Sequence, residues 1–70
     1  MKIEEKITVL IQPEEKIVVM KRAKTARQLL EALNLAEETA LVARNNELLT
    51  PDRRIWANDN ILVRKVASTG

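Results

Sequence analysis

The feature that most constrains this chain is its near lack of glycine, because Gly70 is the only glycine in the 70 printed residues. Glycine ordinarily supplies positive φ in tight turns and at helix ends. Each internal turn that needs this conformation must therefore use another residue, and asparagine tolerates it best. We expect Asn34 to end a helix, and we expect the asparagine-rich residues 45–46 and 58–60 to form tight turns.

The composition narrows the possible chemistry. The chain has no cysteine and no histidine, which argues against structural zinc and haem and excludes a histidine-dependent nucleophilic triad. We expect no bound metal. The formal net charge is only +2, and Trp56 as the one aromatic residue gives no stacking platform for single-stranded nucleic acid. We therefore expect no nucleic-acid partner.

The same composition bears on location. The longest apolar run has four residues, far fewer than a membrane-spanning helix needs. Residues 1–6, MKIEEK, are too charged for the apolar part of a signal peptide. We expect a cytoplasmic protein with no membrane partner.

The first quarter of the chain reads as a β-hairpin. Residues 6–11, KITVLI, alternate so that Ile7, Val9 and Ile11 share one face of a strand. A polar break containing proline separates them from residues 17–20, IVVM, which read as a second strand.

The period then changes to that of a helix. Thr25 and Gln28 have the spacing of a capping box at the start of a helix over residues 26–33. Asn34 is placed to end this helix in the left-handed conformation, and Leu35 is then placed to pack back on it. So short a helix is not stable alone and must lie against the strands.

Three more strands are expected, at residues 39–44, 47–49 and 61–66. Without the short return strand at residues 47–49, the element order is ββαββ. It predicts an α+β domain with a mixed four- to five-stranded sheet and one helix packed on one face.

The last strand carries a candidate docking surface. Its alternation places Ile61 and Val63 on one face and Leu62, Arg64 and Val66 on the other. The second set has apolar residues beside a charge, which is typical of a partner-binding patch, and Leu10 is expected near it. The alternative is that a thin sheet simply exposes a few apolar side chains.

Two other features are expected to have structural roles. Lys21, Arg22, Lys24 and Arg27 form a basic cluster around the helix start, and we interpret it as a solvated charged face, with an interaction role as the alternative. We expect Trp56 to pack at the edge of the sheet.

After the last strand come Ala67, Ser68, Thr69 and Gly70. We interpret residues 1–66 as the folded domain and residues 67–70 as a flexible tail. Small side chains make such a tail slim enough to enter a narrow channel and present its terminal carboxylate to another protein. The alternative is an ordinary frayed chain end.

Taken together, the element order and the tail resemble the ThiS/MoaD family of ubiquitin-like β-grasp sulfur carriers, across essentially the whole chain. Three stretches carry the resemblance: TARQLLEAL at the helix, ALVARNNELLTPD at the following hairpin, and ANDNILVRKVASTG at the closing strand and tail. The short length without an insert is closer to ThiS.

The resemblance implies a β-grasp fold and a protein co-substrate that is not itself an enzyme. Gly70 would be adenylated by a ubiquitin-activating-type enzyme, which uses ATP and Mg²⁺ that this chain does not bind, and then converted to a thiocarboxylate. Ser68 and Thr69 would line the partner's channel, and Leu62, Arg64, Val66 and Ala67 would contact the partner. The sulfur would pass to a synthase for thiamin or molybdopterin, or to a tRNA-thiolating enzyme.

The chain departs from the family at Thr69, where the family has a second glycine. Threonine is bulkier and disfavours positive φ. Three explanations stay open: a partner with a wider channel, a natural chain that continues beyond Gly70, or a member without transfer chemistry. A ubiquitin-like protein modifier and a β-grasp interaction module without terminal chemistry are the alternative functions.

Overall fold

Five β-strands and one α-helix form the part of the chain that the structure, a computed structural model, describes, namely residues 5–66. The strands are β1 (Lys6–Gln12), β2 (Lys16–Lys21), β3 (Ala40–Arg44), β4 (Glu47–Leu49) and β5 (Asn60–Lys65). The helix is α1 (Ala26–Ala32), and a short 3-10 helix, η1 (Glu37–Thr39), precedes β3. The predicted α+β class with one α-helix is confirmed.

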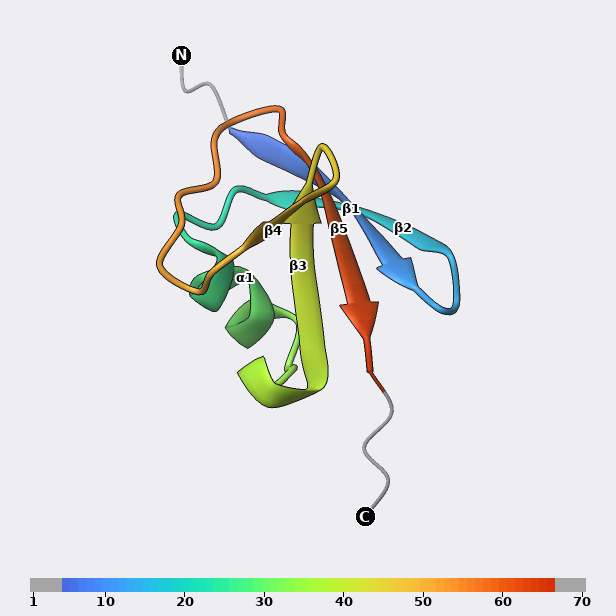
Figure 1. The fold of residues 1–70 in the computed structure, drawn as a ribbon. Helices are drawn as coiled ribbons and strands as arrows, with labels where there is room; N and C mark the ends of the chain where they lie inside the picture. The colour runs from blue at the N-terminus through green and yellow to red at the C-terminus, as the bar shows by residue number, and fades with distance from the viewer. Residues whose placement is uncertain (1–4, 67–70) are drawn as a thin grey trace.

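All the strands belong to one mixed sheet with the order β2-β1-β5-β3-β4. β1 and β5 are parallel, whereas the other neighbours are antiparallel. Figure 1 shows α1 and η1 together on one side of this sheet, with β5 between β1 and β3. The last strand therefore lies at the centre of the sheet, and of the predicted four or five strands the structure has five.

The core lies between α1 and the face of the sheet that α1 covers, which we call the inner face. β1 contributes Ile7, Val9 and Ile11, and β5 contributes Ile61 and Val63, all of them buried. The predicted alternation of these two strands is thus confirmed. The other buried residues of this cluster are Ala26, Leu29, Leu30, Ala40, Val42, Leu49 and Ile55.

The two ends of α1 explain where it begins and stops. The Thr25 hydroxyl accepts a hydrogen bond from the Gln28 backbone N–H at 3.2 Å, as predicted. The Gln28 side chain, however, accepts from the backbone N–H of Lys24 at 3.1 Å, one residue earlier than in a standard capping box.

No helix in residues 5–66 is long and apolar enough to cross a membrane.

At the other end, the Asn34 N–H donates to the Glu31 carbonyl and the Leu35 N–H donates to the Leu30 carbonyl. This pair of bonds is a Schellman motif, in which the residue after the last helical turn has positive φ. Asn34 has φ of 60°, and Leu35 packs against the core. Asparagine thus ends the helix where glycine would be usual.

Asparagine performs the same role in the other turns. Positive φ values are found at Asn45, Asn46 and Asn58, as the near absence of glycine predicts. The first two connect β3 to β4, and the third lies just before β5. Glu15 also has positive φ, 55°, which the sequence did not lead us to expect because glutamate rarely adopts this conformation.

Candidate functional site

The candidate site is the face of the sheet opposite α1, which we call the open face. On it, Leu62 pairs with Leu10 of β1 on one side and with Ala43 of β3 on the other. Leu10 in turn pairs with Ile17 of β2, and Ala43 pairs with Leu48 of β4. Residues directly opposite each other on neighbouring strands point to the same face. The sheet therefore carries one continuous apolar row across all its strands.

We call this set the apolar row; it consists of Ile17, Leu10, Leu62, Ala43 and Leu48. Strands lie about 4.8 Å apart, so the row is roughly 19 Å long. Its ends are strongly exposed, with 67% of Ile17 and 63% of Leu48 accessible to solvent. Its middle is half-buried, because each central side chain is flanked by neighbours from two strands.

The rows on either side are mixed. One contains Gln12, Arg64 and Leu41, with Arg64 exposed in the middle. Within residues 5–66 Arg64 makes no ion pair, so its charge is available to a partner. The other contains Val19, Thr8 and Asn60. The open face thus has an apolar centre and a mixed polar border, which is the anatomy of a protein–protein interface.

Leu62 and Arg64 lie together on the open face, as the alternation of the last strand predicts, and Leu10 lies beside Leu62. Val66 follows the end of β5; it is 38% exposed, and its backbone N–H donates to the Thr39 carbonyl at 2.9 Å. The other predicted site residues, Ala67, Ser68, Thr69 and Gly70, lie outside the described residues. The partner-binding role of the other six residues and the role of Gly70 as the site of adenylation and thiocarboxylate formation stay predictions.

Sequence reasoning missed the outer members of the apolar row. Ile17 and Leu48 were assigned to strands, but which face they occupy depends on pairing between strands. Leu48 is assigned to a face only once Ala43 is known to lie beside Leu62. The turn at residues 45–46 was the available signal, because a two-residue turn pairs Arg44 with Glu47 and hence Ala43 with Leu48.

A contact between side chains lies close to the point where the chain leaves β5. Lys65 Nζ donates to Glu14 Oε2 at 2.9 Å, and this hydrogen bond lowers the pKa of Glu14 below its ordinary value. Glu14 belongs to the loop between β1 and β2. The contact ties the end of the central strand to that loop, although both groups are exposed and the stabilisation is small.

The prediction for Trp56 was wrong. It does not pack at the sheet edge but is 53% exposed, beside the guanidinium groups of Arg22 and Arg54. The physical reason is its neighbour: Ile55 fills the core position and is completely buried, and successive residues of an extended segment point in opposite directions.

The predicted basic cluster is also divided by the fold. Arg22 is half-buried, pairs with Glu5 and donates from Nε to the Ile55 carbonyl at 2.9 Å, so it is not part of a solvated face. Arg27 pairs with Glu37 at 2.8 Å, and that hydrogen bond raises the pKa of Arg27. Of the four residues, only the two lysines are exposed and unpaired within residues 5–66.

The open face is therefore the best-defined candidate site in the described part of the chain, and its apolar centre and mixed border are of the kind found in protein–protein interfaces. Residues 5–66 contain no group of three or more histidine, cysteine, aspartate or glutamate residues that could hold a metal ion. Comparison with known proteins gives no family for this chain, since no family model and no curated protein matches it significantly.

Proposed function

We propose that this protein is a sulfur carrier of the ThiS/MoaD type with a ubiquitin-like β-grasp fold. One helix on one face of a mixed sheet, with the last strand at the centre, is compatible with that fold. In this proposal the chain is a co-substrate, and a ubiquitin-activating-type enzyme performs the catalysis. That enzyme supplies the ATP and Mg²⁺.

The observation that carries the proposal is the position of Leu62. It is the centre of the apolar row and belongs to β5, the last strand before residues 67–70 in the sequence. A partner bound to the open face therefore contacts the strand from which the tail departs. Docking and presentation of the Gly70 carboxylate are thereby coupled through a single strand.

The chemistry then takes place at Gly70 and not on the domain. A carboxylate oxygen attacks the α-phosphorus of ATP, forming an acyl adenylate and releasing pyrophosphate. A sulfur nucleophile attacks the acyl carbon, and AMP leaves with the carboxyl oxygen that it had acquired. The resulting thiocarboxylate passes its sulfur to an acceptor synthase, for thiamin or molybdopterin, or to a tRNA-thiolating enzyme.

The direct test is intact-mass spectrometry of the protein after incubation with the ubiquitin-activating-type enzyme of the same organism, ATP, Mg²⁺ and sulfide. We expect a mass increase equal to the difference between sulfur and oxygen, confined to the C-terminal peptide. Deletion of Gly70 should abolish it. An unchanged mass with every such enzyme of the organism would count against the proposal.

The docking step is tested with a pair of charge-introducing variants. Ile17→Glu alters an exposed end of the apolar row, whereas Ala32→Glu adds the same charge to an exposed position on α1, on the other side of the sheet. We expect the first to slow thiocarboxylate formation at limiting enzyme by about tenfold, as loss of an interface contact of that size implies. The second should leave the rate unchanged.

A second candidate function is favoured by Thr69, which replaces the family's glycine. It is a β-grasp interaction module that binds a partner through the open face without terminal chemistry. If the full chain forms no thiocarboxylate and deletion of Gly70 leaves partner binding intact, this function replaces the first. If Thr69→Gly raises the rate of activation, the side chain of Thr69 is shown to limit entry into the channel.

A further inference from the structure

The only aromatic side chain of the protein is on its surface. Trp56 is 53% exposed, although the core is built from smaller apolar residues and this would be the largest available side chain to bury. An indole ring combines a large contact area with a hydrogen-bond donor, and for that reason tryptophan is enriched at binding surfaces. Its exposure therefore calls for an explanation other than packing.

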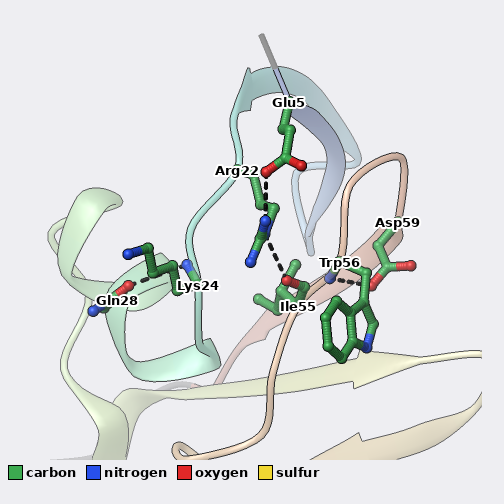
Figure 2. Close-up of polar contacts among 7 residues, drawn as sticks. All are labelled: Glu5, Arg22, Lys24, Gln28, Ile55, Trp56 and Asp59. Carbon is green, nitrogen blue, oxygen red and sulfur yellow. Dashed lines mark hydrogen bonds and ion pairs between the residues drawn. The ribbon is translucent and has the colours of Figure 1, made fainter. Parts of the chain in front are cut away.

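The loop that carries Trp56 is held in place by a network of polar contacts. The Trp56 backbone N–H donates to Asp59 Oδ2 at 2.8 Å, and Arg44 donates to the same oxygen at 2.9 Å (Figure 2 shows the first of these bonds). Arg44 also donates to the Arg54 carbonyl at 3.0 Å. The Arg44 and Asp59 side chains are largely buried, 18% and 21% exposed. A surface residue on a fixed loop costs little additional ordering when a partner binds.

Two guanidinium groups lie near the indole ring, and they differ in the other hydrogen bonds and ion pairs that they make. Arg22 has its Cζ 6.0 Å from the ring centroid and is engaged with Glu5 and the Ile55 carbonyl. Arg54 has its Cζ 5.1 Å from the centroid, within cation–π range, and is exposed. In the part of the chain that the structure describes, the Arg54 side chain makes no ion pair.

The backbone that carries Arg54 is also held in place. The segment before α1 pairs with the segment after β4 through a bridge between Thr25 and Arg54. The Ile55 N–H donates to the Lys24 carbonyl, and the Ala26 N–H donates to the Arg53 carbonyl. Arg54 therefore presents its charge beside the ring from a fixed segment.

We propose that Trp56 and Arg54 form a second binding surface, which we call the tryptophan surface, and that it binds an acidic segment of another protein. A carboxylate can accept two parallel hydrogen bonds from the Arg54 guanidinium, and an apolar side chain beside it can rest on the indole ring. Single-stranded nucleic acid fits less well, because it is bound by successive aromatic platforms and this chain has one aromatic residue.

The tryptophan surface is separate from the place where the tail leaves the domain. Trp56 precedes the first residue of β5, whereas the chain leaves β5 after Lys65, at the opposite end of the strand. Six residues of strand span roughly 20 Å. An acidic partner can therefore bind here while the other end of β5 stays accessible, so this proposal does not depend on the function of Gly70.

The Trp56 indole can report binding to the tryptophan surface, because the protein has only one indole group. The experiment is a ¹H–¹⁵N NMR titration of the full chain that follows the single indole cross-peak. The probe is a blocked synthetic peptide alternating glutamate with leucine. The matched comparison is the same peptide with glutamine in place of glutamate, together with an oligouridylate of equal length. We expect a saturable shift of the indole peak with the acidic peptide and at least tenfold weaker binding of the glutamine peptide.

A variant connects the shift to the Arg54 charge. Arg54→Glu should weaken binding of the acidic peptide by about tenfold, whereas Lys16→Glu, which makes the same charge change at the far end of β2, should have less than a twofold effect. The absence of any shift with the acidic peptide, or equal weakening by Lys16→Glu, overturns the proposal. Binding of the oligouridylate in preference to the peptide overturns the assignment to a protein partner.

Discussion

The two faces of the sheet come from the same strands, yet they differ in what their apolar residues do. In β5, Ile61 and Val63 are buried beneath α1, while Leu62 between them is half-buried on the open face. The inner face is apolar in nearly every row, as a core must be. The open face is apolar mainly in one row that crosses all the strands. Burial beneath a helix explains the first pattern, and the proposed binding of a second molecule would explain the second.

The largest expected effect is a difference in the free energy of unfolding between variants of the inner face and variants of the open face. Ile61 and Ile17 are the same residue type on opposite faces, 2% and 67% exposed. Ile61→Ala should reduce the free energy of unfolding by about 2–5 kcal/mol through the cavity it creates. Ile17→Ala should change it by no more than about 0.5 kcal/mol. Urea denaturation followed by circular dichroism measures both, and equal losses would remove the distinction between the faces.

The next effect concerns binding and tests whether the apolar row acts as a unit. Leu62 is at its centre and Leu48 at one end. Because binding energy concentrates near the middle of an interface, Leu62→Ser should weaken binding to the activating enzyme by roughly a hundredfold and Leu48→Ser by about tenfold or less. Calorimetric titration of each variant, after its fold is checked, gives these ratios. A larger loss of affinity from Leu48→Ser than from Leu62→Ser would show that the interface is centred closer to β4.

A smaller effect concerns the turn that sets which residues occupy each face. Asn45 and Asn46 have positive φ, and the register they impose places Leu48 outward and Leu49 inward. Asn46→Ala should destabilise the domain by about 1 kcal/mol, the ordinary cost of the left-handed conformation. Asn46→Gly should be neutral or slightly stabilising, and thermal unfolding compares the two. A loss with glycine as large as that with alanine would show that the asparagine side chain, and not its backbone, is needed.

The smallest effect concerns Lys65, at the end of β5, where α1 no longer covers the inner face of the sheet. Lys65 follows Val63 by two positions and shares its face, but it is exposed and pairs with Glu14. Because the pKa of Glu14 is lowered in the folded state, its contribution is present above the unfolded pKa and is lost as the pH falls through the folded value. Lys65→Met should raise the pKa of Glu14 toward its ordinary value and remove this slight loss of stability in acid. NMR titration of the Glu14 carboxyl carbon measures it, and an unchanged pKa would mean that the ion pair is not formed in solution.

The sequence predicted the local structure well for a physical reason. Alternation in β1 and β5, the cap at Thr25 and the left-handed turn at Asn34 depend on residues within a few positions of each other. The near absence of glycine made the asparagine turns easier to recognise, because no other residue type was better suited to those positions.

The rest depends on residues that are distant in sequence. The strand order places β5 between β1 and β3, and only this order joins Leu10, Leu62 and Ala43 into one row. Trp56 was misplaced because Ile55, its neighbour, takes the core position. Competition between two adjacent apolar residues for one buried position is decided by packing from elsewhere in the chain, which composition and spacing do not reveal.

The most direct test of the central claim, that the apolar row binds the activating partner, is methyl cross-saturation NMR. The protein, deuterated except at its labelled isoleucine and leucine methyl groups, is mixed with the protonated enzyme and ATP, and the enzyme protons are irradiated. The account predicts intensity loss at Ile17, Leu62 and Leu48, with none at Leu29 beneath α1. Losses centred on α1, with those three methyl groups unaffected, would contradict it.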